Sequence, residues 1–225
     1  MLDIQAPGAV KGEVLDDYLA RGWFRCGSMV HTTDRVTLDI RKTYPVYWLR
    51  YRVEAIQLCK KNLHLIGHNK QFTVSCMPFE ITQEIQNLFA RYRTRRKFHI
   101  RPKLEGILLN ADNFFFDSYI MEVRDNGRLI AAGVFDRGHH SIQDMINFYD
   151  PLYKKYSLGK YLMLLKYKYC LQNGFTFYYP GYYIPGQDTL SYKLFIDKNA
   201  TEVYLPEANT WIGYYEFERD HSICL

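Results

Sequence analysis

The chain has 225 residues, of which 48% are hydrophobic and 24% are charged, so we expect one large globular domain or two small ones rather than a disordered chain. No apolar run approaches the ~20 residues that a membrane span needs, which argues against a membrane protein. The net charge of +5 is mild, whereas the aromatic content of 16% is high enough to build a core and also to line a cleft with tyrosines.

Cysteine usage and the first residues indicate a reduced protein of the cytoplasm. The five cysteines are dispersed without a Cys-x-x-Cys pair, which argues against a disulfide framework and a metal centre. We therefore expect free thiols, and neither a metal nor another cofactor. The opening MLDI lacks the basic and apolar regions of a secretory signal, so we expect a cytoplasmic location.

Four segments of the first half have a clear periodicity. Residues 13–20 predict a helix that ends at Gly22. Residues 46–62 carry apolar side chains at the three- and four-residue spacing of a helix, flanked by basic residues. Residues 72–76 alternate as a strand does, and residues 80–94 predict a helix whose last turn carries arginines.

The second half predicts a series of strands around one helix. Asp125-Asn126-Gly127 joins two apolar runs and is a strong hairpin signal, because Asn-Gly tolerates positive φ. Pro180-Gly181 is expected to end the last strand. In chain order we expect strands at 118–124, 128–135 and 141–149, a helix at about 160–172, and a strand at 175–179.

This β-β-β-α-β order, with a glycine-containing loop before the helix, resembles the middle of the acetyltransferase-like (GNAT) fold. By this analogy we expect an α+β protein with a mixed, mostly antiparallel sheet flanked by helices. A smaller α/β part is expected to precede the GNAT-like domain, with residues 1–100 forming the first part and residues 101–225 the second.

Basic residues gather in stretches without acids. Residues 85–104 contain seven Lys or Arg and no Asp or Glu, and residues 151–187 are also free of acids. Interleaved tyrosines suit a phosphodiester backbone with unstacked bases at its end. The alternative is a set of solvated helix faces that acids balance elsewhere in space. A third basic cluster consists of Arg41, Lys42, Arg50, Arg52, Lys60 and Lys61.

Five short motifs occur in a fixed order over residues 18–195. They are YLARGWFRCG at 18–27, FYDP at 148–151, SLG with Tyr161 at 157–161, GYYIP at 181–185, and Tyr192-Lys193. Together they resemble the arginyl/leucyl-tRNA–protein transferase family. Members of that family move an amino acid from charged tRNA to the N-terminal amine of a protein and so mark it for degradation.

The resemblance implies an aminoacyltransferase whose partners are a charged tRNA and a protein N-terminus, with an acidic first residue favoured. Two departures from the family pattern affect this expectation. No cysteine-rich segment precedes Tyr18, so we expect a short form without a cluster-based regulatory function. The family's C-x-K-M is replaced by QDTLS at 187–191, which leaves the donated amino acid, and activity itself, open.

The implied reaction is aminolysis of an ester by an α-amine, whose pKa of about 7.7–8.0 makes a strong base dispensable. Positioning and donors for the tetrahedral oxyanion are needed instead, and residues 150–159 are where a GNAT-like sheet supplies them. We expect catalytic roles for Tyr182, Tyr183, Tyr192, Lys193 and Asp150, donor-tRNA contacts from Ser157, Gly159, Lys154, Lys155, Arg93, Arg95 and Arg96, and an acceptor pocket at Trp23 and Arg25.

Structural roles are the alternative for each of these residues: core aromatics, a turn cap at Asp150 and a helix-entry glycine at Gly159. Two other functions also stay open. One is a CoA-dependent N-acyltransferase, although Tyr161 replaces the small residue that a CoA cradle requires. The other is a catalytically silent module that binds tRNA or protein N-termini. Oligomeric state is not predicted.

Overall fold

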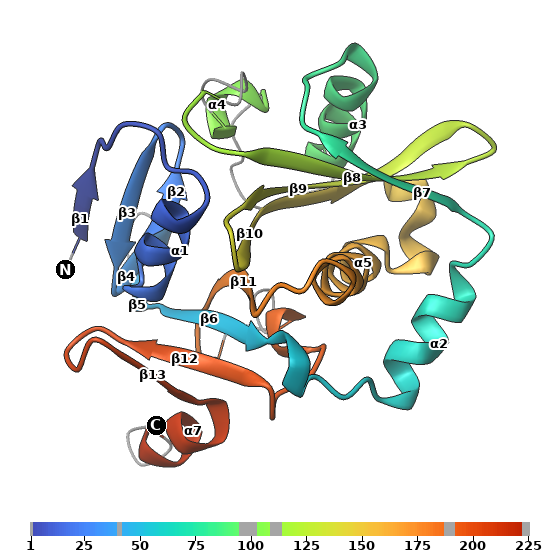
Figure 1. Ribbon diagram of the computed structural model, residues 1–225. Helices are drawn as coiled ribbons and strands as arrows, with labels where there is room; N and C mark the ends of the chain where they lie inside the picture. Colours follow the sequence, from blue (N-terminus) through green and yellow to red (C-terminus); the bar gives the residue numbers. More distant parts are fainter. Residues whose placement is uncertain (1, 40–41, 95–102, 109–113, 187–191, 222–225) are drawn as a thin grey trace.

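The computed structural model describes residues 2–39, 42–94, 103–108, 114–186 and 192–221. Its centre is an eight-stranded sheet with the order β13-β12-β6-β11-β10-β9-β8-β7 (Figure 1). All neighbouring strands are antiparallel except β10 and β11, which are parallel. The strands are β6 (Tyr47–Arg52), β7 (Thr73–Pro78), β8 (Ser118–Asp125), β9 (Arg128–Arg137), β10 (Ser141–Tyr149), β11 (Phe177–Tyr183), β12 (Thr201–Leu205) and β13 (Thr210–Gly213).

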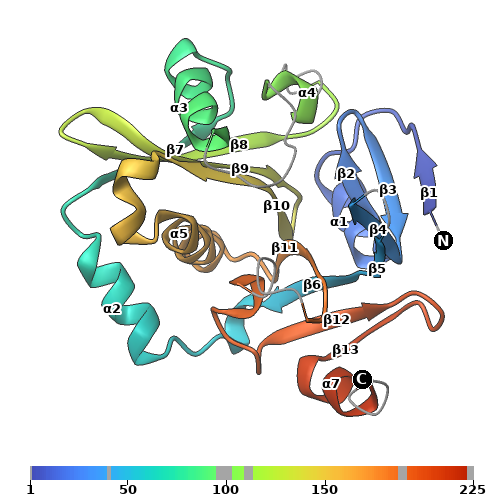
Figure 2. The ribbon, with the colours of Figure 1, turned by 180° about the vertical axis from the view of Figure 1, so that it is seen from behind.

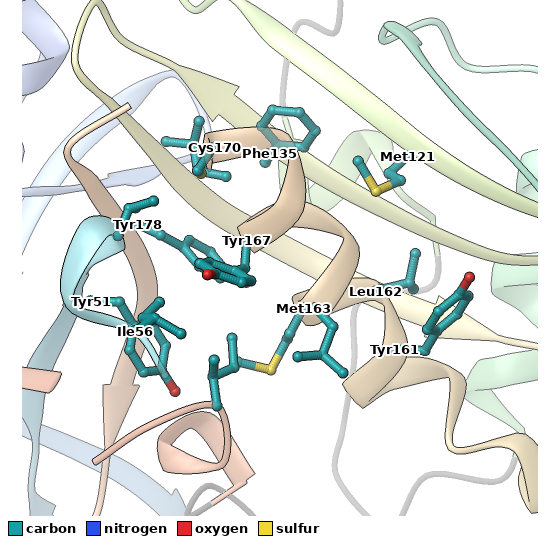
Figure 3. Packing of buried hydrophobic residues seen from close by; sticks show 14 of the residues in the cluster. Tyr51, Ile56, Met121, Phe135, Tyr161, Leu162, Met163, Tyr167, Cys170 and Tyr178 are labelled. Carbon is teal, nitrogen blue, oxygen red and sulfur yellow. The ribbon is translucent and has the colours of Figure 1, made fainter. Parts of the chain in front are cut away.

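Helices cover both faces of this sheet (Figures 1 and 2). The central helix α5 (Leu158–Gln172) packs on one face, and α3 (Gln83–Arg93) packs with α4 (Glu105–Leu108) on the opposite face. Figure 3 shows the core beside α5, where Leu162 and Met163 meet Tyr178 of β11 and Phe135 of β9 in one cluster. None of the described helices is long and apolar enough to cross a membrane.

The N-terminal segment forms a three-stranded sheet and a two-stranded sheet beside the large one. Its elements are β1 (Leu2–Gln5), α1 (Glu13–Ala20), β2 (Phe24–Cys26), β3 (Met29–Thr33), β4 (Arg35–Asp39) and β5 (Lys42–Pro45). Phe24 of β2 stacks on Trp48 of β6 with ring centroids 3.6 Å apart, so an aromatic cluster joins the three-stranded sheet β1-β3-β2 to the large one.

Shorter elements complete the chain: 3₁₀ turns η1 (Val53–Ala55), η2 (Pro151–Tyr156) and η3 (Tyr192–Leu194), and helices α2 (Lys60–His68) and α7 (Tyr214–His221). Helix α2 contacts α5, and α7 contacts β12 and β13.

The predicted β-β-β-α-β order is confirmed in β8, β9, β10, α5 and β11, and the mixed, mostly antiparallel sheet flanked by helices is the GNAT-like fold. Two local predictions are wrong. Residues 46–52 are not helical, because β6 lies between β11 and β12 and pairs with both. Strand β11 does not end at Pro180-Gly181, because a bulge between Tyr178 and Gly181 accommodates the proline, and pairing with β6 resumes beyond it.

The expected division near residue 100 falls next to residues 95–102, which lie outside the described part of the chain. Strands β6 and β7 precede this point in the sequence and pair with strands that follow it. The two-part division therefore stays a prediction, and the two parts would have to share one sheet.

Candidate functional site

Strands β10 and β11 diverge after a short stretch of parallel pairing. They pair only where Ser141, Ile142 and Gln143 meet β11. Beyond that point β10 has an irregularity after Asp144, and β11 has its own before Gly181. Beyond the divergence, residues of β10, η2, the start of α5 and η3 meet at one place.

A cavity of about 280 Å³ opens at this place. It lies where β10 passes through η2 into the first turn of α5, and η3 closes another side. Its lining residues are Asn147, Tyr149, Lys154, Ser157, Gly159, Lys160 and Tyr192. The structure thus brings together the predicted donor residues Lys154, Ser157 and Gly159 with the predicted catalytic residue Tyr192.

The entry into α5 presents unpaired backbone donors beside this cavity. Ser157 has a left-handed backbone (φ 49°, ψ 43°), and its carbonyl accepts from the N–H groups of Lys160 (3.0 Å) and Tyr161 (3.1 Å). The N–H groups of Leu158 and Gly159 have no hydrogen-bond partner in the described part of the chain. Together with the positive end of the helix dipole, they suit an anion or another strong acceptor.

A buried polar cluster lies below the cavity. The Lys166 ammonium is fully buried and donates to Asp144 Oδ1 (2.5 Å) and Asn147 Oδ1 (2.9 Å). Asp144 Oδ2 accepts from the Tyr178 hydroxyl (2.8 Å) and from Asn147 Nδ2 (2.7 Å). Burial lowers the pKa of Lys166, and the attraction of Asp144 opposes that shift. Asn147 Oδ1 accepts from Lys166 and one N–H of Nδ2 donates to Asp144, so the second N–H of Nδ2 is held in a fixed position.

Sequence reasoning did not find this cluster. One signal that could have revealed the cluster was a glycine. A Cβ at Gly133 of β9 would lie 2.5 Å from Asn147 Oδ1 and 2.9 Å from Lys166 Nζ, so only glycine leaves space for these polar atoms. A lysine in a helix with apolar residues on all sides was a second signal, because such a position buries the ammonium.

Lys193 supplies an amine beside the β11 bulge. Its Nζ lies 4.9 Å from the ring centroid of Tyr182 and has no hydrogen-bond or ion-pair partner among the residues that the structure describes. Burial lowers the pKa of Lys193 to about 8, although the attraction of Asp144 opposes the shift. The Tyr51 hydroxyl donates to the Lys193 carbonyl and so fixes the backbone that carries this amine.

The two neighbouring tyrosines have different surroundings. Tyr182 is half-buried and packs edge-on against Trp48, with centroids 5.1 Å apart. Tyr183 is buried in a cluster with Tyr214 and Phe217 of α7, so it belongs to the core on that side and does not line the cavity. Burial raises the pKa of both phenols, so both are protonated at neutral pH.

Arg25 lies in a buried ion pair and is not available in an open acceptor pocket. Its guanidinium donates to Asp136 (2.8 Å), to Ser118 Oγ (2.9 Å) and to the Gly27 carbonyl (2.7 Å), and it lies 4.2 Å from the Phe116 ring centroid. The side chains of Arg25 and Asp136 are 2% and 0% exposed. This geometry corrects the predicted role, because the partner that the guanidinium needs is already inside the protein.

Trp23, the other predicted acceptor residue, is half-buried at the edge of the aromatic cluster between the two sheets. Its ring meets that of Tyr18 edge-on, with centroids 6.2 Å apart. It does not line the cavity at the strand divergence. A part for Trp23 in acceptor binding stays a prediction.

Asp150 is buried and also acts structurally. One of its carboxylate oxygens accepts from Arg91 (3.1 Å) and Arg128 (2.7 Å), and the other accepts from the Leu152 N–H at the start of η2. It therefore caps the turn that leads into α5 and has no free oxygen for proton transfer. Its role is to hold η2, and with it the predicted donor residues, against β9 and α3.

The structure describes one of the three predicted tRNA-binding arginines. Arg93 is half-buried in the last turn of α3, whereas Arg95 and Arg96 lie outside the described residues. Lys155 is exposed on η2, with its Nζ 5.0 Å from the ring centroid of Tyr156, and does not line the cavity.

Residues 84–200, over half of the chain, match the family model described as "Arginine-tRNA-protein transferase, C terminus". The chain belongs to this family. It is an aminoacyltransferase that uses charged tRNA, which confirms the expectation from the five motifs. The family match covers the whole strand divergence, η2 and α5.

The chain is also similar to named relatives and to solved structures. An aspartate/glutamate leucyltransferase of Leptospira interrogans (serovar copenhageni) is 22% identical over 222 residues, covering 96% of this chain and 84% of the relative. One of Shewanella sp. (strain ANA-3) is 27% identical over 184 residues, covering 80% and 74%. A crystal structure of FemX covers 100% of this chain and 74% of its own at a TM-score of 0.48 and 10% identity. L-PGS from Bacillus licheniformis covers 76% and 50% at a TM-score of 0.45 and 12% identity.

Proposed function

We propose that this enzyme transfers leucine from charged tRNA to a protein whose N-terminal residue is Asp or Glu. The observation that carries the proposal is the buried Lys193 amine, which has no partner among the described residues and follows Tyr192 of a cavity lined by backbone and side-chain donors. Support for the amino acids comes from relatives that align with nearly the whole chain and are named aspartate/glutamate leucyltransferases. Charged tRNA is abundant in the cytoplasm, which we propose as the location.

The aminoacyl ester is proposed to enter the cavity with its carbonyl near Asn147. The acceptor's neutral α-amine attacks that carbonyl, an amide bond forms, the bond to the terminal ribose oxygen breaks, and that oxygen takes up the proton that the amine loses. The remaining N–H of the Asn147 amide is held in a fixed direction by Lys166 and Asp144, so it suits the oxygen that becomes negative in the tetrahedral intermediate. The N–H groups of Leu158 and Gly159 then suit the 3′ end of the tRNA.

Lys193 is proposed to bind the acidic side chain of the acceptor's first residue. An ammonium that has lost water without gaining a partner favours a carboxylate, because a charge-assisted hydrogen bond restores the missing interaction. A bound carboxylate also raises the pKa of the amine and keeps it charged. Arg25 had been expected to supply this cation, but Asp136 already neutralises it.

A panel of donors and acceptors tests this function. Purified enzyme is incubated separately with Leu-tRNA and Arg-tRNA, and with peptides that begin with Asp, Glu, Ala, Arg or Lys. We expect mass spectrometry to find one added leucyl residue on the Asp and Glu peptides and little product in the other combinations. Preferential arginine transfer, or leucine transfer that favours Arg or Lys peptides, would contradict the proposal.

A further inference from the structure

A basic surface borders the cavity on the side of α2 and η2. We call it the α2–η2 surface. Its side chains are exposed except for that of Tyr156, which is half-buried. The residues that form it are Lys60, Lys61, His64, His68, Lys70, Lys154, Lys155 and Tyr156.

Two buried amides hold this surface in one shape. Asn62 of α2 donates from Nδ2 to the Ile196 carbonyl (2.7 Å), and Asn69, just after the helix, donates to the Tyr156 carbonyl (3.1 Å). Both asparagines are at most 2% exposed. The two elements, although distant in the sequence, therefore present their charges as one rigid unit.

The positive charge of this surface is not neutralised within the described part of the chain. None of its lysines forms an ion pair there, whereas Arg50, Arg91 and Arg124 are all paired with carboxylates. Two acids on neighbouring segments have other partners: Asp125 accepts from the Tyr153 hydroxyl, and Asp197 accepts from backbone N–H groups of Gln57 and Asn199. Free cations on a rigid face favour a polyanionic partner.

Flat rings accompany the charges. His64 and His68 stack with an interplanar angle of 9° and centroids 6.2 Å apart, and His68 lies 5.1 Å from the Tyr156 ring. The Lys155 ammonium lies 5.0 Å from the centroid of the same tyrosine. Rings that alternate with cations are typical of surfaces that bind nucleic acids.

We propose that the α2–η2 surface binds the phosphate backbone of the acceptor stem of the donor tRNA. Lys154 and Lys160 line the cavity, so the nucleotides before the aminoacyl end pass over η2, and α2 continues the basic path from there. The inference rests on the use of charged tRNA in the proposed function but not on which amino acid is transferred. It adds α2 to the tRNA contacts expected from Lys154, Lys155, Arg93, Arg95 and Arg96.

The salt dependence of tRNA binding tests this proposal. The double variant Lys60→Ala with Lys61→Ala is compared with wild type and with Lys11→Ala plus Lys198→Ala, which removes the same charge from exposed positions elsewhere. Deacylated tRNA is titrated by fluorescence anisotropy between 50 and 200 mM salt (about the range where phosphate contacts dominate). The magnitude of the log–log slope should fall by about 1.4–1.8 in the α2 variant, since each lost phosphate contact removes about 0.7–0.9.

Each outcome has one meaning. A reduced slope in the α2 variant and an unchanged slope in the control would support the surface. An unchanged slope in the α2 variant would overturn it, and so would an unchanged slope with a raised KM for acidic peptides, which would assign the surface to the acceptor protein. If the slope falls but wild-type enzyme transfers no leucine, the surface stands and the proposed leucyl transfer fails.

Discussion

Gly181 and Lys193 meet at one point of the β11 bulge, so a change of the glycine acts on the amine. Gly181 has φ +96°, and a Cβ there would lie 2.7 Å from Lys193 Nζ. Gly181→Ala therefore displaces the ammonium and also adds backbone strain of about 1–3 kcal/mol. We expect at least a ~10-fold loss of kcat/KM on Asp peptides, because about 1.4 kcal/mol of lost transition-state stabilisation is tenfold in rate.

Gly174→Ala is the matched control for this prediction. Gly174 also has a positive φ, +70°, but a Cβ there would meet no atom within 4 Å. Its substitution carries the backbone strain without touching Lys193. Equal activity of the two variants, measured at a temperature where thermal melts show both to be folded, would show that Gly181 does not act on the site.

Arg25 leads to a prediction about stability rather than about acceptor choice. Arg25→Ala leaves Asp136 buried without its cation, and breaking a buried pair in this way costs about 3–5 kcal/mol. Urea denaturation should show this loss, whereas Arg52→Ala, which breaks a pair whose arginine is 56% exposed, should cost no more than about 1 kcal/mol. Similar losses in the two variants would show that the Arg25 pair contributes little.

Single residues also show how far the sequence could lead. Three residues of the cavity could be found from the sequence, because each belongs to a short motif at the end of an element. They are Ser157, Gly159 and Tyr192. The Asp144–Lys166 pair was not found, because its members are 22 residues apart and only the packing of α5 on β10 brings them into contact.

At the level of elements, turn signals were more reliable than periodicity. The Asn-Gly hairpin between β8 and β9 and the SLG motif at the start of α5 placed the central strands and helix correctly. Residues 46–62 combine a buried strand, a 3₁₀ turn and the start of α2, so their apolar spacing imitated one helix. The pairing of β6 with both neighbours decided its conformation, and sequence spacing contains no information on such partners.

In the whole molecule, the site is assembled from parts of the chain that are far apart. The divergence of β10 and β11 opens the cavity, α5 supplies its backbone donors, and η3 brings Tyr192 to it from the next segment. Helix α2 then extends the basic surface away from this point. The chain order of β8, β9, β10, α5 and β11 could be predicted from the sequence, whereas the relative positions of η3, α2 and α5 depend on the final packing.

The account depends most on Lys193 as the group that selects acidic acceptors. The decisive measurement is the ratio of kcat/KM for an Asp peptide to that for an otherwise identical Ala peptide, taken across pH for wild type and Lys193→Met with Leu-tRNA as donor. The α-amines of the two peptides titrate alike, so the ratio reports the charge on the free enzyme.

In the wild type this ratio should be high below pH 8 and should decline as pH rises through about 8, because the amine then loses its proton. In Lys193→Met it should be close to ~1 and independent of pH, because a fully lost charge-assisted contact removes the preference. A variant that keeps the wild-type ratio would contradict the assignment of Lys193.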